Sequence, residues 1–168
     1  MRFFFRSDSP LTRDYRVLHK SMDEAKQVDK AYDAHLKAIA TKLPDITRAF
    51  VMAPWYQDWN HHDCPHDSWF LDLSLKACVE NDEDRTVDLT IKLLGAYNDR
   101  ILTLNYHNVT LCDFEIQKQG RHNTGDWLFD EFDVLENGFV SHEILWQFGK
   151  PWKIISESVE FSSADRIS

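Results

Sequence analysis

The chain has 168 residues, 43% of them hydrophobic, which is enough for one domain to bury a core without disulfides or a structural metal. Asp and Glu number 28 against 19 Lys and Arg, so the formal net charge is -9 and argues against nucleic acid as a partner. The three phenylalanines within residues 1–6 are too few for a signal-peptide core or a membrane span, so we expect a cytoplasmic protein with no membrane partner.

Residues 1–54 are predicted to form a strand followed by helices. The strand covers 1–6, and Ser21 with Glu24 makes a capping box for a long helix that Pro44 ends. Asp45 is expected to cap a second, short helix, which Pro54 ends. The residues expected to face the core are Ala25, Val28, Tyr32, Leu36, Ile39 and Leu43 in the first helix, and the second helix is expected to run through Ile46, Ala49 and Phe50.

Residues 69–162 change from helical to alternating periodicity and are predicted to form an antiparallel β-meander of roughly seven strands. Asn137-Gly138 is the clearest hairpin turn within it. The expected fold class is α+β, with N-terminal helices packed on an antiparallel sheet that is open or partly closed as a barrel, in a single domain over 1–168. In the first strand the apolar residues expected to share a half-buried face are Trp69, Leu71, Leu73, Leu75, Ala77 and Val79.

Hairpin register predicts a cluster of charged residues on the last three strands. If Asn137-Gly138 and Gly149-Lys150 are two-residue loops, His142 lies opposite Asp133 on one side and opposite Glu157 on the other, and Glu131 shares their face. Carboxylates and a histidine on a rigid sheet could hold a divalent metal ion or act as general acid and base. Charge pairs across strands are also ordinary on a solvated sheet face, and that interpretation is the better supported.

A second group of ligand-type residues lies in the segment between Trp55 and Trp69. Its members are His61, His62, His66 and Asp67, but no His-x-x-x-His or Cys-x-x-Cys spacing accompanies them, so a polar connection is favoured over a metal site. His66-Asp67 could instead hold the start of the first long strand through hydrogen bonds to the backbone. The aromatic residues Trp55, Tyr56 and Trp59 are candidate anchors for a partner, although packing against the core is the favoured role.

The cysteines predict reduced thiols. Cys64, Cys78 and Cys112 are odd in number and form no Cys-x-x-Cys pair, so neither a disulfide framework nor a thiolate zinc site is indicated.

The chain resembles a loose group of uncharacterised small bacterial proteins. The residues that carry the resemblance are Tyr32 and Leu36 on the helix, Leu43-Pro44 at its end, His66-Asp67 before the meander, Asp-Trp-Leu-Phe-Asp-Glu at 126–131 and His-Glu-Ile-Leu at 142–145. The group has a Leu before the His-Asp step, where this chain has Pro65. The resemblance implies the fold and a bacterial source, but no activity. Acidic, β-rich bacterial domains of this kind also occur as immunity proteins, which neutralise a toxin by binding it.

Two functions therefore stand as expectations. The first is a non-catalytic protein-binding domain of the immunity type, because an acidic surface steers association with basic partners. The alternative is a metal-binding protein or metal-dependent hydrolase that uses one of the two histidine clusters with a divalent metal. No catalytic residue and no cofactor is predicted, since the five glycines form no phosphate-cradling run. The oligomeric state is left open.

Overall fold

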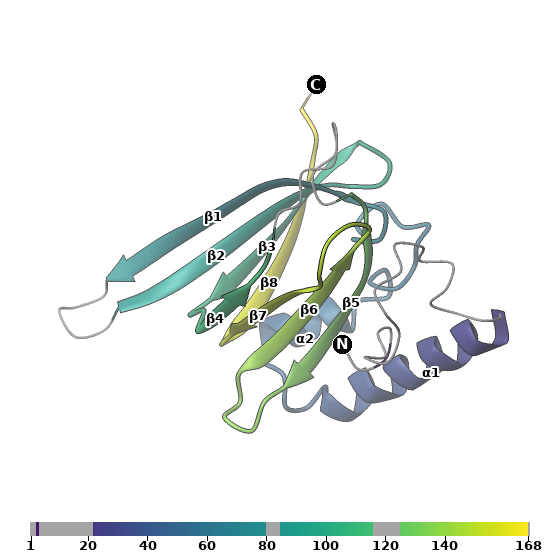
Figure 1. The fold of residues 1–168 in the computed structure, drawn as a ribbon, viewed down its shortest axis with the longest axis horizontal. Coiled ribbons are helices and arrows are strands. Elements are labelled where there is room, and N and C mark those ends of the chain that lie inside the picture. The colour runs from purple at the N-terminus through teal and green to yellow at the C-terminus, as the bar shows by residue number, and fades with distance from the viewer. Residues whose placement is uncertain (1–2, 4–21, 80–84, 116–124, 168) are drawn as a thin grey trace.

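The computed structural model of the chain describes residues 3, 22–79, 85–115 and 125–167 (Figure 1). The predicted first strand, apart from Phe3, and the capping box at Ser21 lie outside these residues. The described part contains two helices and eight strands, which confirms the α+β class with antiparallel sheets. The helices are α1 (Met22–Ile39) and α2 (Asp45–Val51). The strands are β1 (Trp69–Val79), β2 (Arg85–Leu94), β3 (Arg100–His107), β4 (Leu111–Asp113), β5 (Trp127–Val134), β6 (Val140–Trp146), β7 (Trp152–Ser156) and β8 (Ser158–Asp165).

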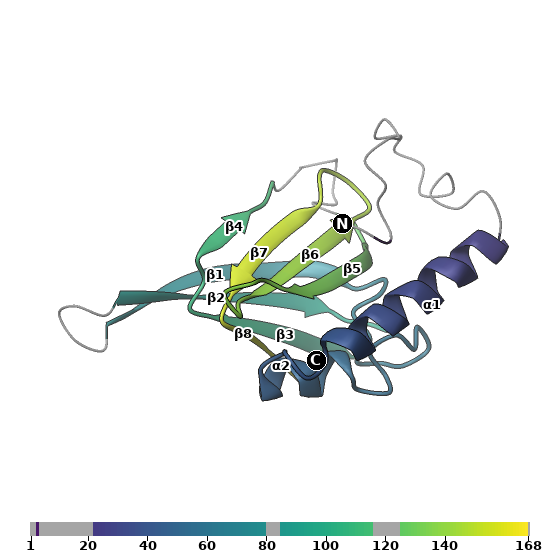
Figure 2. The same ribbon diagram turned by 90° about the horizontal axis from the view of Figure 1, so that it is seen from below.

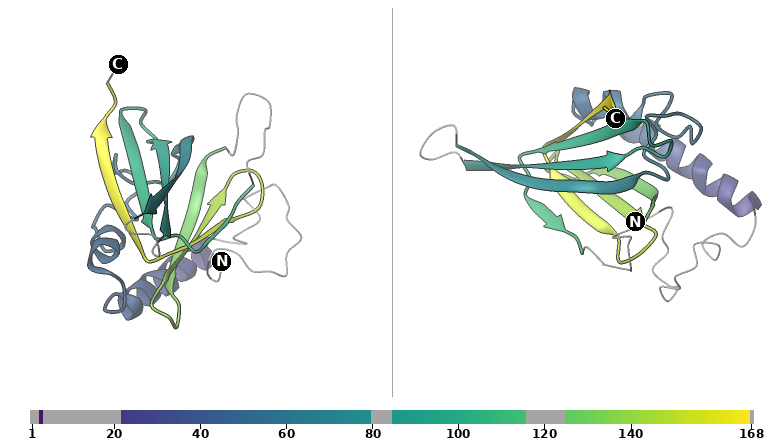
Figure 3. Two further views of the ribbon diagram at one scale, coloured as in Figure 1. Left: turned by 90° about the vertical axis from the view of Figure 1, so that its left-hand side faces the viewer. Right: turned by 90° about the horizontal axis from the view of Figure 1, so that it is seen from above.

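The described strands form two four-stranded sheets and no closed barrel. The first sheet has the order β1-β2-β3-β8 and the second has the order β4-β7-β6-β5. The order departs from a simple meander at two places, because β8 returns to pair with β3 and β4 pairs with β7. Between β7 and β8 the chain passes from one sheet to the other through the single residue Glu157. Figures 2 and 3 show the two sheets facing each other, with the helices along one side.

The core lies between the two sheets. Alternate residues of β2 and β3 face inward from the first sheet, and the second sheet supplies an aromatic layer. Phe70 joins the two by packing edge-on against Trp146 and Trp152, with ring centroids 6.1 and 5.5 Å away. The largest fully buried side chains include Leu89, Ile91, Leu93, Leu102, Leu104 and Tyr106 from the first sheet and Trp127, Phe132, Ile144, Trp146 and Trp152 from the second.

The helices cover the side of the sandwich at β5 and β8. Tyr32, Leu36 and Ile39 of α1 are buried, as their spacing predicts, and α1 contacts β5. The second helix is present where it was predicted, but its expected cap is wrong, because Asp45 is the first helical residue of α2 after an N-cap at Pro44. Of its apolar residues, Ile46 and Ala49 are exposed and Phe50 is buried. Within the described residues, no helix combines the length and the apolar character that crossing a bilayer requires.

The buried face of α2 is set by its contact with the edge strand β8. Thr47 is fully buried and its Oγ1 accepts a hydrogen bond from the Val159 N–H at 2.7 Å, while Phe50 stacks on Phe161 with centroids 4.9 Å apart. This hydrogen bond thus satisfies the N–H of Val159 on the edge strand β8, which could otherwise pair with an added strand. A threonine that serves the backbone in this way belongs on the buried face even though hydrophobic periodicity does not place it there.

The hairpin of β1 and β2 forms an arm that extends past the end of the second sheet (Figures 1 and 2). The half-buried face predicted for β1 is wrong in part, because a bulge between Phe70 and Asp72 resets the alternation at Leu71. Phe70 and Leu73 are partly buried against the core, whereas Trp69, Leu71 and Leu75 are exposed.

Candidate functional site

The turn at Asn137-Gly138 sets the position of His142. The predicted two-residue loop is wrong: Leu135 N–H donates to Phe139 O, so residues 136–138 form a three-residue loop, with Gly138 at φ +85°. His142 consequently lies opposite Phe132 instead of Asp133. A slip of one residue moves a side chain to the other face of the sheet. His142 therefore points into the core, and Glu131 and Asp133 lie on the opposite face of β5.

The second assumed turn, at Gly149-Lys150, also differs from the structure. His142 lies opposite Ile154 on β7, and Glu157 is exposed between β7 and β8, where its Oε2 accepts from Asn108 Nδ2 at 3.2 Å. Glu131 accepts a hydrogen bond from Phe3 N–H at 2.8 Å, and Asp133 lies 3.6 Å from His35. The structure thus does not bring together Glu131, Asp133, His142 and Glu157.

His142 instead belongs to a buried polar network. It is fully buried, its ring stacks on Phe132 with centroids 3.9 Å apart, and both of its nitrogens have partners. The Tyr106 hydroxyl lies 2.8 Å from Nδ1, and the Asp130 carboxylate lies 3.1 Å from Nε2. A ring with its proton on Nε2 satisfies both contacts, because Tyr106 O–H then donates to Nδ1 and Nε2–H donates to Asp130.

Asp130 connects this network to two more tyrosines. Its carboxylate accepts from the Tyr56 hydroxyl and, at 3.3 Å, from Trp127 Nε1. The Tyr56 and Tyr32 hydroxyls lie 3.4 Å apart, and Phe132 N–H donates to the Tyr32 oxygen at 2.8 Å. Burial, and after it the charge of Asp130, raises the pKa of each of the three tyrosines well above the ordinary value of 10.0. Their hydroxyls therefore stay protonated and donate.

A cavity of about 380 Å³ lies against the outer end of this network. It is lined from α1, from the segment after α2 and from the start of β5. Among the described residues that line it, the charges are those of three aspartates, Asp29, Asp58 and Asp130, and there is neither Lys nor Arg. Its aromatic lining residues are Tyr32, Tyr56, Trp59, Trp127 and Phe129. The cavity is thus a hollow with aromatic walls and an acidic lining.

Trp59 is the most exposed of the aromatic residues that line the cavity. It is 53% exposed, and its ring stacks on His66 at 4.2 Å. His66 is in turn held by a hydrogen bond from Nδ1 to the Leu128 carbonyl at 2.7 Å. This bond is the predicted contact of a side chain with the backbone for His66, whereas Asp67 contributes through its own backbone, with its N–H donating to Trp127 O at 2.9 Å. The wall is therefore anchored to β5 although its outer surface faces solvent.

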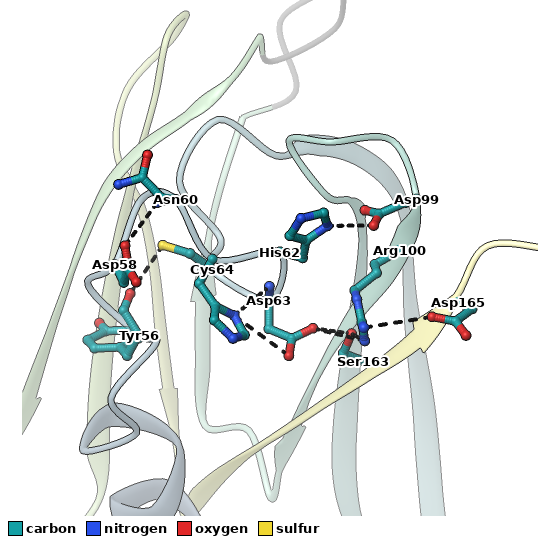
Figure 4. Close-up of polar contacts among 11 residues, drawn as sticks. Tyr56, Asp58, Asn60, His62, Asp63, Cys64, Asp99, Arg100, Ser163 and Asp165 are labelled. Atoms are coloured by element: carbon teal, nitrogen blue, oxygen red, sulfur yellow. Dashed lines mark hydrogen bonds and ion pairs between the residues drawn. The ribbon is translucent and has the colours of Figure 1, made fainter.

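The histidines of this segment point to separate partners. Figure 4 shows His62 turned toward Asp99, 2.5 Å away, and Asp63 turned toward Ser163 and Arg100, 2.6 and 3.3 Å away. The hydrogen bond from His62 lowers the pKa of Asp99. His61 stacks on Trp55 and lies 3.9 Å from Asp63. In the part of the chain that the structure describes, no three His, Cys, Asp or Glu side chains are grouped so that they could hold a metal ion.

The three aromatic residues singled out from the sequence have different environments. Tyr56 is buried in the network, Trp55 packs against Phe161 with centroids 4.6 Å apart, and Trp59 is open to solvent. The residues that the sequence reasoning missed are Asp130 and Tyr106. Asp130 could have been found from a three-residue loop at 136–138, which places it on the same face as Phe132, His142 and Ile144. Tyr106 follows from alternation along β3, but nothing local pairs it with His142.

Comparison with models of protein families, with curated proteins and with solved structures finds no match. The resemblance to small bacterial proteins therefore stays a prediction.

Proposed function

We propose that this chain is a non-catalytic binding protein of the immunity type, which binds another protein by taking a basic side chain of that partner into the cavity beside Asp130. The observation that carries the proposal is the composition of the cavity, whose described lining has aromatic walls and three aspartates but no Lys or Arg. A guanidinium or ammonium group is attracted both by aromatic faces and by carboxylates. Aromatic residues are also enriched among those that dominate binding at protein interfaces.

The geometry of the opening suits a side chain that enters from outside. Trp59 presents its exposed ring at the opening, and Asp58 is exposed beside it. Deeper in the cavity, the Asp130 side chain is only 12% exposed. A long basic side chain can therefore lay its alkyl part along the aromatic wall while its charged end approaches Asp130.

The overall charge of the chain favours the same class of partner. A net charge of -9 raises the rate at which basic proteins approach, and this effect is largest at low salt. Charge alone does not select a site, however. The cavity supplies the selection because the carboxylates and the aromatic faces converge there.

The network beneath the cavity supports binding over catalysis. His142 is fully buried, and both of its nitrogens are within hydrogen-bond distance of Tyr106 and Asp130, so it cannot touch a molecule in the cavity. Asp130 already accepts from Tyr56, Trp127 and His142. These groups stabilise one another, and no observation on the described residues favours the metal-dependent alternative.

Calorimetric titration with a hexa-arginine peptide tests the proposal, with hexa-lysine and hexa-glutamate peptides beside it. Trp59→Ala removes the exposed aromatic wall, and Asp58→Asn removes one cavity charge while retaining an oxygen that can accept the Asn60 N–H. Each variant should weaken hexa-arginine binding about fivefold or more. The matched control is Asp165→Asn, which removes one exposed charge on β8 outside the cavity and should change the affinity by less than about twofold. Equal weakening by Asp58→Asn and Asp165→Asn would show that only the overall charge acts and would overturn the proposal.

A further inference from the structure

The outer edge of β1 is an unusually long open strand edge. In the described residues β1 pairs along its length with β2 alone, and its other side is met only at Trp69, by an isolated bridge to Asp126. Figures 1 and 3 show β1 at the margin of the arm. An edge strand presents unpaired N–H and C=O groups that can pair with another strand. Both faces of β1 are open as well, since Leu75 is 52% exposed on the inner face and Asp72, Ser74 and Lys76 are exposed on the outer face.

The sequence around Ser74 is complementary to itself in the antiparallel direction. One residue to either side of Ser74 are Leu73 and Leu75, and two residues to either side are Asp72 and Lys76. If two copies of β1 pair antiparallel with Ser74 opposite Ser74, Leu73 meets Leu75 of the second copy and Asp72 meets Lys76 of the second copy. Because a two-fold axis repeats this pair, the interface contains two pairs of Asp72 with Lys76.

The register between β1 and β2 extends this complementarity across the sheet. Asp72 lies opposite Lys92 and Lys76 lies opposite Asp88. In the paired arrangement, the outer face therefore carries a row of alternating sign across four strands. The row reads Lys92 and Asp72 of one copy, then Lys76 and Asp88 of the other. Adjacent opposite charges on one sheet face stabilise the pairing of their strands.

The inner face gives an apolar row in the same register. Leu73 lies opposite Ile91 and Leu75 lies opposite Leu89 within one copy. Pairing about Ser74 places the 52% exposed Leu75 beside Leu73 of the second copy, so the exposed apolar surface of each arm is covered by the other. The outer and inner faces thus favour the same register independently.

Other registers do not satisfy both faces. Pairing about Leu73 or Leu75 places Asp72 opposite Ser74 or Cys78 of the second copy and places no carboxylate of the second copy opposite Lys76. A shift of one residue places Asp72 opposite an apolar residue, either Leu75 or Ala77. A lysine on an edge strand usually prevents pairing with another strand. Here Lys76 does not, because Asp72 of the second copy lies opposite it.

We infer that two copies of this chain associate through antiparallel pairing of β1 about Ser74, which joins the two first sheets into one continuous eight-stranded sheet. This interface is separate from the cavity, whose lining lies in α1, the segment after α2 and β5. Dimerisation and binding of a basic partner can therefore be tested apart.

Charge reversal at the two positions provides the test, with the mass measured by sedimentation equilibrium over a range of concentrations. The unaltered chain should approach twice its mass of 19.8 kDa as its concentration rises. Asp72→Lys alone places two lysines opposite each other across the axis, and Lys76→Asp alone places two aspartates there. Each variant alone should therefore self-associate about tenfold more weakly or worse. Mixed in equal amounts, the two variants should form a heterodimer, because each lysine then meets an aspartate of the other chain.

The mixing step separates the interface from damage to the arm. Both variants also place like charges against Lys92 or Asp88 of β2 within their own chain, and this defect is present equally in the separate and the mixed samples. The control Lys42→Asp, an exposed reversal between α1 and α2, should leave self-association unchanged. A chain that stays monomeric at all concentrations, or variants that do not recover on mixing, would overturn the inference. Hexa-arginine binding by the same variants reports separately on the cavity.

Discussion

Two hairpins of this protein differ in which side chains they bury: one has polar residues in the core, and the other has apolar residues exposed to solvent. In the hairpin of β5 and β6, Asp130 and His142 face the core, and His142 is fully buried. In the arm of β1 and β2, Leu71 and Leu75 face solvent at 49% and 52% exposure. Both hairpins alternate along the chain, so alternation alone does not tell which face is covered.

The difference lies in what packs over each hairpin. The inner face of β5 and β6 is covered by the first sheet and α1, so its polar groups must find partners inside the protein, and His142, Tyr106 and Asp130 supply them to one another. The arm extends past the second sheet (Figure 1), and Leu75 on its inner face stays exposed, whereas Leu71 lies at the bulge that shifts the alternation of β1. Which side chains are buried thus follows from the arrangement of the sheets. A buried polar group needs a hydrogen-bond partner, whereas an exposed apolar side chain is available for association with another molecule.

The largest effect is expected from removing His142. His142→Ala should lower the free energy of unfolding by about 4 kcal/mol, because it leaves a void beside Phe132 and removes a partner from both Tyr106 and Asp130. Urea denaturation followed by circular dichroism measures the change. Glu136→Ala in the exposed loop beyond β5 is the control and should change it by less than about 0.5 kcal/mol. A loss below about 1 kcal/mol would mean that the buried network does not stabilise the second sheet.

A pair of leucines opposite each other in the arm gives the next largest effect. Leu75 on β1 and Leu89 on β2 are direct partners, yet Leu89 is fully buried and Leu75 is 52% exposed. Leu89→Ala should cost about 3 kcal/mol of unfolding free energy, and Leu75→Ala about 0.5 kcal/mol or less. The measurement uses dilute protein, so that any pairing of β1 does not contribute. Similar losses in the two variants would contradict the contrast in burial on which the comparison depends.

The sequence predicts the elements of this fold better than it predicts their faces. The stripe with Tyr32, Leu36 and Ile39 gives a buried helix face, because helical periodicity is a local property that packing here does not override. Thr47 is missed because its burial depends on a hydrogen bond to Val159, which is distant in sequence. The bulge at Leu71 is missed because nothing in the residue types marks where the pairing shifts.

The prediction of the candidate site failed for the same reason, because the sequence does not determine which residues share a face. Asn137-Gly138 predicts a turn correctly, but it does not distinguish a two-residue loop from a three-residue loop, and that single residue exchanges Asp133 for Phe132 opposite His142. The partners of His142 come from β3 and β5, and their pairing depends on how the two sheets face each other. A difference of one residue in loop length is hard to recognise from the local sequence, yet it changes which residues lie opposite each other.

A smaller effect is expected at Asp88, on the outer face of the arm. Although partial burial acts to raise it, hydrogen bonds from Asn108 N–H and His107 lower the pKa of Asp88 below its ordinary value of 3.8. A carboxylate with a lowered pKa adds stability above its unfolded pKa and loses that contribution as the pH falls through the folded value. Asp88→Asn should therefore cost about 1 kcal/mol at pH 7, and the difference from the unaltered chain should shrink below about pH 4. Urea titrations at pH 7, 5 and 3 measure this; a difference that grows at acid pH would contradict the sign.

The least perturbing test compares two cysteines without substitution. Cys64 is buried beside the cavity, where its thiol donates to the Tyr56 carbonyl at 3.3 Å and burial raises its pKa to about 11. Cys112 is exposed on β4. Alkylation needs the thiolate, so at pH 8 iodoacetamide should modify Cys64 about a hundredfold more slowly than Cys112. Peptide mass spectrometry over time gives both rates in one sample. A ligand held in the cavity should slow Cys64 further and leave Cys112 unchanged, whereas comparable rates in the free protein would mean that the segment around Cys64 opens readily. This measurement thus reports whether the covered region of the molecule stays covered in solution, on which the contrast with the open arm depends.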